Sequence, residues 1–155
     1  MTRNEFAHVI GPVFEHSPWI AERSWEKRPF TSAQTLREAL HDTVRSASDD
    51  EKLALIRAHP DLVGRAVLTS ESQSEQAAAG LGELTADEVA AFEKYNSAYR
   101  ARFGFPFVIC ARRNKKEAIL RAFPERLQNT PAKEIETALR EIFQIAEIRL
   151  NDLIS

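Results

Sequence analysis

A histidine followed by a proline stands at the end of a helical pattern, in the segment "IRAHPDLVG", residues 56–64. Because a proline ring disfavours the helical conformation at the residue before it, we expect His59 to leave the path of the helix where the helix ends. Histidine is the side chain whose ordinary pKa suits proton transfer near neutral pH. His59 is therefore a candidate general acid or base, although the same position also suits a structural histidine.

The segment "SESQSEQAAAGL", residues 70–81, supplies a carboxylate and an amide in the irregular part of the chain between Pro60 and Gly82. Ser72 is placed to cap a short helix with Glu75 as its reciprocal partner, which is the structural interpretation. A carboxylate close to a histidine can instead fix the tautomer of the ring and raise its basicity. Spacing alone does not show that His59 and Glu75 meet, so the cap and the catalytic pair remain alternatives.

The last helical pattern, residues 131–153, carries a charged side chain on its apolar stripe. At about 100° per residue, Arg149 falls about 40° from Ile135 on the helical wheel. An unpaired buried guanidinium is very costly, so Arg149 must pair with an acid, extend to the surface or reach a polar cavity. In a cavity its planar fork would suit an anion. The stripe is formed by Ile135, Leu139, Ile142, Ala146, Leu150 and Leu153.

Other polar and sulfur-containing residues give weaker signals. Asn96 lies on the apolar face of a predicted helix, and we expect its amide to hold the following segment "FGFPFV" in place. The remaining histidines have no metal-ligand spacing, so no metal site is expected. Cys110 is the only cysteine, which excludes an internal disulfide and favours a reducing, cytoplasmic location. Its apolar surroundings indicate a buried, inert thiol.

Composition favours a single soluble domain over residues 1–155. Hydrophobic residues make up 43% and charged residues 28% of the chain, and the net charge of −2 gives no electrostatic case for nucleic acid. No apolar run approaches the ~20 residues that a membrane span requires.

Helix starts are predicted at Ser17, at Thr31, at Ser48 with Glu51, and at Thr85 with Glu88. The only β-like run, residues 105–110, is expected to be a buried extended segment, because one strand makes no sheet. We therefore predict an all-α fold, a single-domain compact bundle of about seven to nine helices.

Five segments occur together in a specific order: "FEHSPWIAE", "AHPDLVGR", "TSESQSEQAAAGL", "YNSAYRARFGFPFVI" and "IAEIRLNDL". This ordered set resembles the 2-oxo-4-hydroxy-4-carboxy-5-ureidoimidazoline (OHCU) decarboxylase family over residues 6–153. The connection between "HPDLVGR" and "SESQSEQ" is shorter than in many members of that family, which affects the shape of a loop more than the candidate residues.

The resemblance implies an all-α homodimer that needs neither a metal nor an organic cofactor and that converts the OHCU anion to (S)-allantoin in urate breakdown. It implies that His59 is the catalytic histidine and Glu75 its acidic partner. The substrate contacts that it implies are Pro60, Ser72, Gln76, Phe107, Val108, Ile109, Cys110, Ala111 and Arg149.

Two functions of other classes remain open on the residues alone. One is a cofactor-free lyase or hydrolase that uses the same histidine and carboxylate on another small heterocycle. The other is a non-enzymatic helical interaction module, in which Arg149 and Asn96 are purely structural polar groups.

Overall fold

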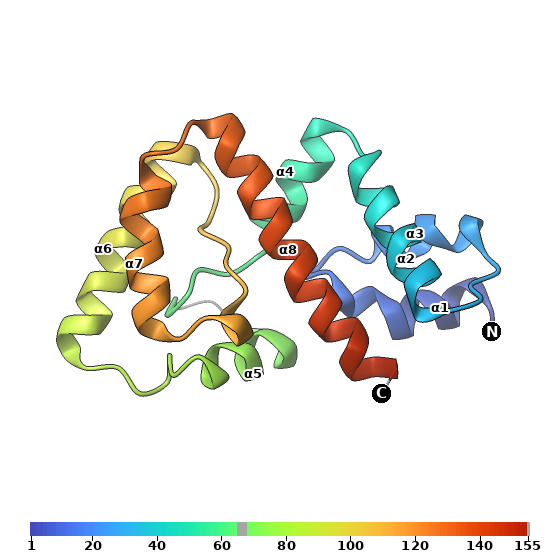
Figure 1. The fold of residues 1–155 in the computed structure, drawn as a ribbon, viewed down its shortest axis with the longest axis horizontal. Coiled ribbons are helices and arrows are strands. Elements are labelled where there is room, and N and C mark those ends of the chain that lie inside the picture. The colour runs from blue at the N-terminus through green and yellow to red at the C-terminus, as the bar shows by residue number, and fades with distance from the viewer. Residues whose placement is uncertain (65–67, 155) are drawn as a thin grey trace.

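The computed structural model describes residues 1–64 and 68–154, and within them the chain is entirely helical apart from loops and turns (Figure 1). The short connection noted above includes residues 65–67, which lie outside the described part. Eight α-helices occur in the described residues, which confirms the predicted all-α class and helix number. They are α1 (Arg3–Ile10), α2 (Trp19–Ser24), α3 (Ala33–Arg45), α4 (Asp49–Arg57), α5 (Ser70–Ala78), α6 (Ala86–Phe103), α7 (Lys116–Leu127) and α8 (Pro131–Ile154). Three 3₁₀ turns are η1 (Gly11–Val13), η2 (Trp25–Lys27) and η3 (Ala111–Arg113).

Local capping chemistry sets most helix starts. At α4 the Glu51 amide donates to Ser48 Oγ over 3.1 Å, and the Ser48 amide donates to Glu51 Oε1 over 3.0 Å. Thr85 and Glu88 repeat this arrangement at α6, so both predicted capping boxes are confirmed. The start predicted at Thr31 shifts by one residue, because Ser32 caps α3.

Two predicted caps are wrong. Helix α2 begins at Trp19, and the Ser17 hydroxyl donates to the carbonyl of Glu15 over 2.9 Å instead of capping the helix. Thr69, not Ser72, caps α5, because Thr69 Oγ1 accepts the Ser72 amide at 3.2 Å. The helix therefore starts earlier than predicted, and Ser72 becomes a buried residue within its first turn.

Helix α8 crosses the middle of the molecule, with α1 to α3 on one side and α6 and α7 on the other (Figure 1). Residues 105–110 are extended and buried, as predicted, and run between α6 and η3. Phe107 in this segment stacks on Phe123 of α7, with ring centroids 3.8 Å apart. The buried packing fixes the extended segment against the long helices, although it has no neighbouring strand in the described residues.

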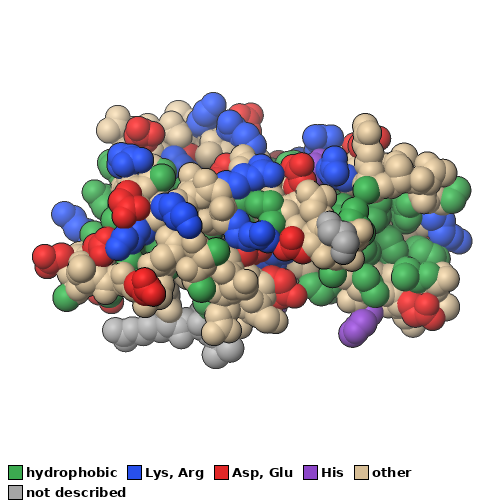
Figure 2. Space-filling model, turned by 60° about the horizontal axis from the view of Figure 1, so that its bottom comes forward, with side chains coloured by type: hydrophobic (Ala, Val, Ile, Leu, Met, Phe, Trp, Pro, Cys, Tyr) green, Lys and Arg blue, Asp and Glu red, His purple; other side chains and the backbone are tan. Residues whose placement is uncertain are grey.

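Lys and Arg side chains alternate with Asp and Glu side chains over the face drawn in Figure 2. Hydrophobic side chains gather toward the right of this view, over the N-terminal helices. Within the described ranges, every helix is too short or too polar to cross a bilayer.

Candidate functional site

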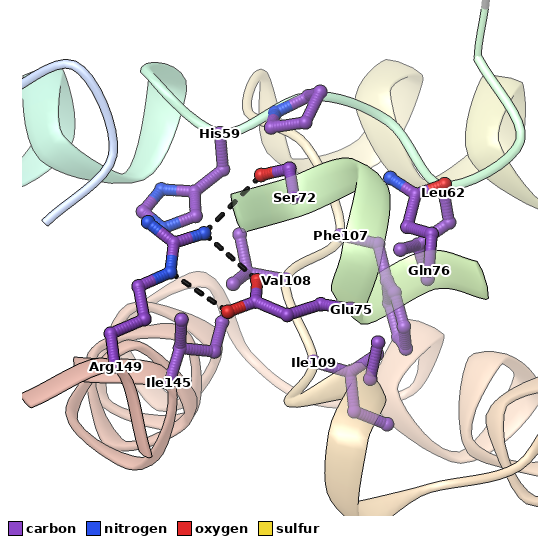
Figure 3. Close-up of a pocket in the computed structure, with 12 residues that line it drawn as sticks. His59, Leu62, Ser72, Glu75, Gln76, Phe107, Val108, Ile109, Ile145 and Arg149 are labelled. Carbon is purple, nitrogen blue, oxygen red and sulfur yellow. Dashed lines mark hydrogen bonds and ion pairs between the residues drawn. The ribbon is translucent and has the colours of Figure 1, made fainter. Parts of the chain in front are cut away.

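One hollow brings most of the candidate residues together (Figure 3). The space within it that the centre of a water-sized sphere can occupy is about 30 Å³, and the hollow opens to solvent. The segment after α4, helix α5, the extended segment and α8 all contribute to its wall. The lining residues are His59, Pro60, Leu62, Ser72, Glu75, Gln76, Phe107, Val108, Ile109, Ala111, Ile145 and Arg149. Of the residues singled out in the sequence for a site, Cys110 is not among those that line it.

His59 is held at the edge of this cavity by the end of α4. The helix ends at Arg57, and Pro60 follows the histidine, as the sequence indicated. The ring Nδ1 lies 2.9 Å from the Leu55 carbonyl oxygen. Because a carbonyl only accepts, Nδ1 carries the proton and Nε2 is left as the basic nitrogen.

The protonation state of His59 follows from its surroundings. Only 6% of the residue is exposed, and burial lowers the pKa of His59 to about 4. The hydrogen bond to Leu55 and the negative charge of Glu15 act in the opposite direction, while the positive charge of Arg149 adds to the lowering. The imidazole is therefore neutral at physiological pH, which is the form that can accept a proton.

Glu75 pairs with Arg149 and not with His59. Arg149 Nε donates to Glu75 Oε2 and Nη2 donates to Glu75 Oε1, each over 2.8 Å (Figure 3). Nη1 donates to the Pro12 carbonyl over 3.1 Å, and Nη2 also lies 3.3 Å from Ser72 Oγ. No hydrogen bond or ion pair joins Glu75 to His59 among the described residues, so Glu75 does not orient the imidazole directly.

Ser72 and Gln76 lie one turn apart on α5, on the two sides of Glu75. The Ser72 hydroxyl donates to the carboxylate of Glu15, so its single proton is already used and only a lone pair remains for a ligand. Gln76 Oε1 accepts the Val63 amide at 3.2 Å. The Gln76 Nε2 group has no acceptor in residues 1–64 and 68–154, and it is the amide group that can donate to a ligand.

The extended segment offers fewer backbone groups to the cavity than the sequence suggested. The Val108 carbonyl accepts from Arg126 Nη1 at 2.6 Å, and the Cys110 amide donates to Glu141 Oε1 over 3.0 Å. Cys110 is 1% exposed, and burial raises the pKa of its thiol. Cys110 is thus a packed residue beside the site. Within the described chain, Phe107 and Ile109 are the cavity residues whose backbone N–H and C=O are both unpaired.

Asn96 holds a different segment from the one expected. Its Nδ2 donates to the Leu62 carbonyl over 2.8 Å, so it fixes residues 60–64 and not the "FGFPFV" segment. Val63 in that segment has a φ of 58°, a left-handed conformation that is unfavourable for a β-branched residue. The hydrogen bonds from Asn96 and to Gln76 offset this strain. The turn that follows His59 is therefore fixed by polar side chains of α5 and α6.

Glu15 is the charged residue that the sequence reasoning missed. It lies between η1 and α2 and is only 2% exposed. Thr69 Oγ1 donates to its Oε1 over 2.8 Å, and Arg149 Nη1 lies 3.5 Å from the same oxygen. Its place in "FEHSPWIAE", one of the segments that carry the family resemblance, was the only signal in the sequence.

The arrangement suits proton transfer to and from an anionic or polar heterocycle. It combines a neutral histidine, a buried cation with two carboxylates, an amide donor and apolar walls. In the parts of the chain described, no three His, Cys, Asp or Glu side chains lie so that they could hold a metal ion.

Comparison with known sequences gives one family. The sequence model of the family described as OHCU decarboxylase matches residues 1–151. A relative from Halalkalicoccus jeotgali, named 2-oxo-4-hydroxy-4-carboxy-5-ureidoimidazoline decarboxylase, is 41% identical over 97% of this chain and 86% of its own. A human relative, named as a putative enzyme of the same kind, is 40% identical over 99% of this chain and 91% of its own.

Solved structures agree with the sequence comparison. The crystal structure of an (S)-allantoin synthase matches with a TM-score of 0.81 and 32% identity, covering 99% of this chain and 51% of that longer chain. An OHCU decarboxylase crystallised in the presence of (S)-allantoin matches with a TM-score of 0.73 and 27% identity, covering 86% and 89% of the two chains. By sequence over nearly its whole length, this chain belongs to the OHCU decarboxylase family.

Proposed function

We propose that the cavity around His59 is the active site at which OHCU is decarboxylated to (S)-allantoin in urate catabolism. Membership of the family and relatives named for this reaction support the activity. The observation that carries the assignment of the site is a neutral, buried histidine on a cavity that also holds Glu75, Gln76 and Arg149.

The substrate supplies its own electron sink. One ring carbon carries both the carboxylate and the hydroxyl, and the neighbouring carbon, which bears the ureido group, is doubly bonded to nitrogen. When the bond to the carboxylate breaks and CO₂ leaves, its electron pair is accepted by this C=N group. The ring nitrogen that takes the pair gains one proton, so the OHCU anion and one proton together give allantoin and CO₂. Because the substrate delocalises the electrons, the proposed mechanism draws on no external electron sink.

His59 moves the protons in this scheme. Nε2 takes the hydroxyl proton as that oxygen becomes the carbonyl of allantoin, while Nδ1 remains bonded to Leu55. The imidazolium then returns a proton to the carbon that bears the ureido group. Delivery from one fixed side of the cavity would produce a single enantiomer.

Arg149 contributes charge without gripping the departing carboxylate. Its guanidinium is already bonded to Glu75, Ser72 and the Pro12 carbonyl. A tight bond to the substrate carboxylate would stabilise the ground state and slow the loss of CO₂. Glu75 keeps acceptor capacity for the ureido N–H groups, and Gln76 Nε2 is placed to donate to a ring carbonyl.

The test is His59→Asn, assayed with OHCU generated from urate by urate oxidase and hydroxyisourate hydrolase. Wild-type protein should accelerate the decay of OHCU and give optically active allantoin, measured by circular dichroism. The variant should fold but leave the decay at its spontaneous rate with racemic product. Full activity in folded His59→Asn would refute the assignment, and an inactive wild type would refute the function.

The assembly proposed for the chain is a homodimer of one domain each, residues 1–155, in the cytoplasm. The family resemblance supports the dimer, and Leu153 and Ile154 at the end of α8 are each 49% exposed, so apolar surface is present for a contact. The free thiol of Cys110 suits a reducing compartment. Light scattering of the purified chain measures the mass: a dimer supports this part of the proposal, and a monomer at micromolar concentration contradicts it.

A further inference from the structure

Glu15 is a buried carboxylate that none of the catalytic steps above uses. Isolated buried charges are strongly unfavourable, and acids of this kind are kept where other groups stabilise them. Three side chains from two other elements converge on this one: Thr69 and Ser72 at the start of α5 donate hydrogen bonds to it, and Arg149 of α8 lies 3.5 Å away. The fold therefore maintains an ionised acid behind the catalytic histidine.

The charges of this cluster do not balance. Arg149 is matched directly by the two-point contact with Glu75, which leaves the carboxylate of Glu15 as a surplus negative charge. Burial alone would raise the pKa of Glu15, but the hydrogen bonds from Ser72 and Thr69 and the charge of Arg149 outweigh it, so this pKa is lowered. The surplus charge is thus permanent at neutral pH.

Glu15 and His59 line the same second cavity, so His59 is the neighbouring group that this charge can influence. Glu15 is the acid whose charge favours the protonated ring, and Arg149 is the cation that opposes it. Beyond Arg149 lies Glu75. The other charged or titratable groups near the ring line an adjoining cavity and are His16, Arg57, Asp61 and Arg100, of which Asp61 and Arg100 form an ion pair with a 2.9 Å contact.

We propose that Glu15 is a positioning residue that stabilises the imidazolium form of His59 during the reaction, through its charge and through the bonds that hold Ser72 and Arg149. This inference rests on the proposed function. A buried ring resists protonation, yet His59 must hold a proton between its removal from oxygen and its delivery to carbon. A fixed carboxylate nearby lowers the free energy of that charged intermediate without touching the substrate.

The decisive comparison is between Glu15→Gln, which keeps the size of the side chain but removes its charge, and Glu15→Asp, which keeps the charge. Glu15→Gln should lower kcat about tenfold or more, with KM changed much less, since an opposite charge close by is worth about one pKa unit or more. Glu15→Asp should retain more activity than Glu15→Gln. Glu22→Gln, an exposed acid on α2, is the matched control and should behave as wild type.

NMR titration of the His59 ring gives a readout that packing alone would not change. The His59 resonance is assigned by its loss in His59→Asn, and the fraction of protonated ring at pH 4 should be lower in Glu15→Gln than in wild type. Glu15→Gln with wild-type kcat, an Asp variant no better than the Gln variant, or an unchanged His59 titration would each overturn the proposal.

Two further results have defined meanings. If Glu15→Gln does not fold, Glu15→Asp, which keeps the charge, carries the test. A kcat and a protonated fraction of His59 that both stay at wild-type values or fall together support the coupling, and a reduced kcat with an unchanged His59 titration overturns it. If the wild-type chain does not accelerate OHCU decay, the proposed function fails, while the titration of His59 still decides whether Glu15 acts on the ring.

Discussion

Removal of the Arg149 guanidinium should be far more costly than removal of an arginine from a surface ion pair. The Arg149 side chain is 5% exposed and its partners Glu15 and Glu75 are 1% and 12% exposed, so Arg149→Met would leave two buried carboxylates without a cation. Breaking a buried pair in this way costs about 3–5 kcal/mol of unfolding free energy. In a domain of this size that corresponds to a fall in Tm of about 6–20 °C.

The control is Arg112→Met, which removes a surface pair with Asp152 whose side chains are 40% and 61% exposed. Exposed pairs of this kind contribute about 0–1 kcal/mol. Unfolding in urea, followed by circular dichroism at pH 7, measures both variants. The double variant Arg149→Met, Glu75→Gln should recover part of the loss, because it removes one of the unpaired charges.

The pH dependence adds an independent check on Arg149→Met. In wild type the lowered pKa of Glu15 contributes stability that is present above the unfolded-state pKa of about 4.3 and is lost as pH falls through the lower folded-state value. Without Arg149 one cause of the lowered pKa disappears. The difference in unfolding free energy between wild type and Arg149→Met should therefore become smaller from pH 7 toward pH 4.5. This electrostatic account of the site would be refuted if Arg149→Met lost no more unfolding free energy than Arg112→Met. It would also be refuted if the difference in unfolding free energy between Arg149→Met and wild type did not change with pH.

Two further predictions concern the turn and the ring. The pKa of His59 is lowered to about 4 from an unfolded value of about 6.5. The folded protein is therefore most stable above pH 6.5, and about 3 kcal/mol of unfolding free energy is lost as pH falls toward 4. The urea midpoint should fall more steeply with acid in wild type than in His59→Asn. Parallel slopes would contradict the burial of a neutral ring. Asn96→Ala should lower the unfolding free energy by about 1–2 kcal/mol, because it leaves the Leu62 carbonyl without its donor. It should also raise KM, because Leu62 lines the cavity. An unchanged KM in the folded variant would show that this turn does not affect the site.

The features that the sequence predicted well depend on neighbours in the chain. The capping boxes at Ser48 and Thr85 involve residues three apart, and the end of α4 before His59 follows from the proline beside it. The cap predicted at Ser72 failed because Thr69, three residues earlier, competes for the same role. Only the folded chain shows that Ser72 is needed elsewhere, as a donor to Glu15.

The pairing of polar groups could not be predicted, because it depends on which elements pack together. The helical wheel showed that Arg149 required a partner, but Glu75 and Glu15 are 74 and 134 positions away in the sequence. The same limit explains why Asn96 was assigned to the segment that follows it, when its acceptor is Leu62, 34 positions earlier. A polar residue on an apolar face thus predicts burial and a need for partners, while the identity of the partner is a tertiary property.

The separation of Glu75 from His59 changes the division of labour within the site. A carboxylate bonded to the imidazole would orient it, but here the Leu55 carbonyl fixes the tautomer and Glu75 neutralises Arg149. Orientation and charge compensation are therefore assigned to different groups. A backbone carbonyl cannot balance a full positive charge as a carboxylate does. In our proposal the protonated ring is therefore stabilised by the charge of Glu15, which does not touch it. This makes the charge of Glu15, more than that of Glu75, the one expected to control proton transfer by His59.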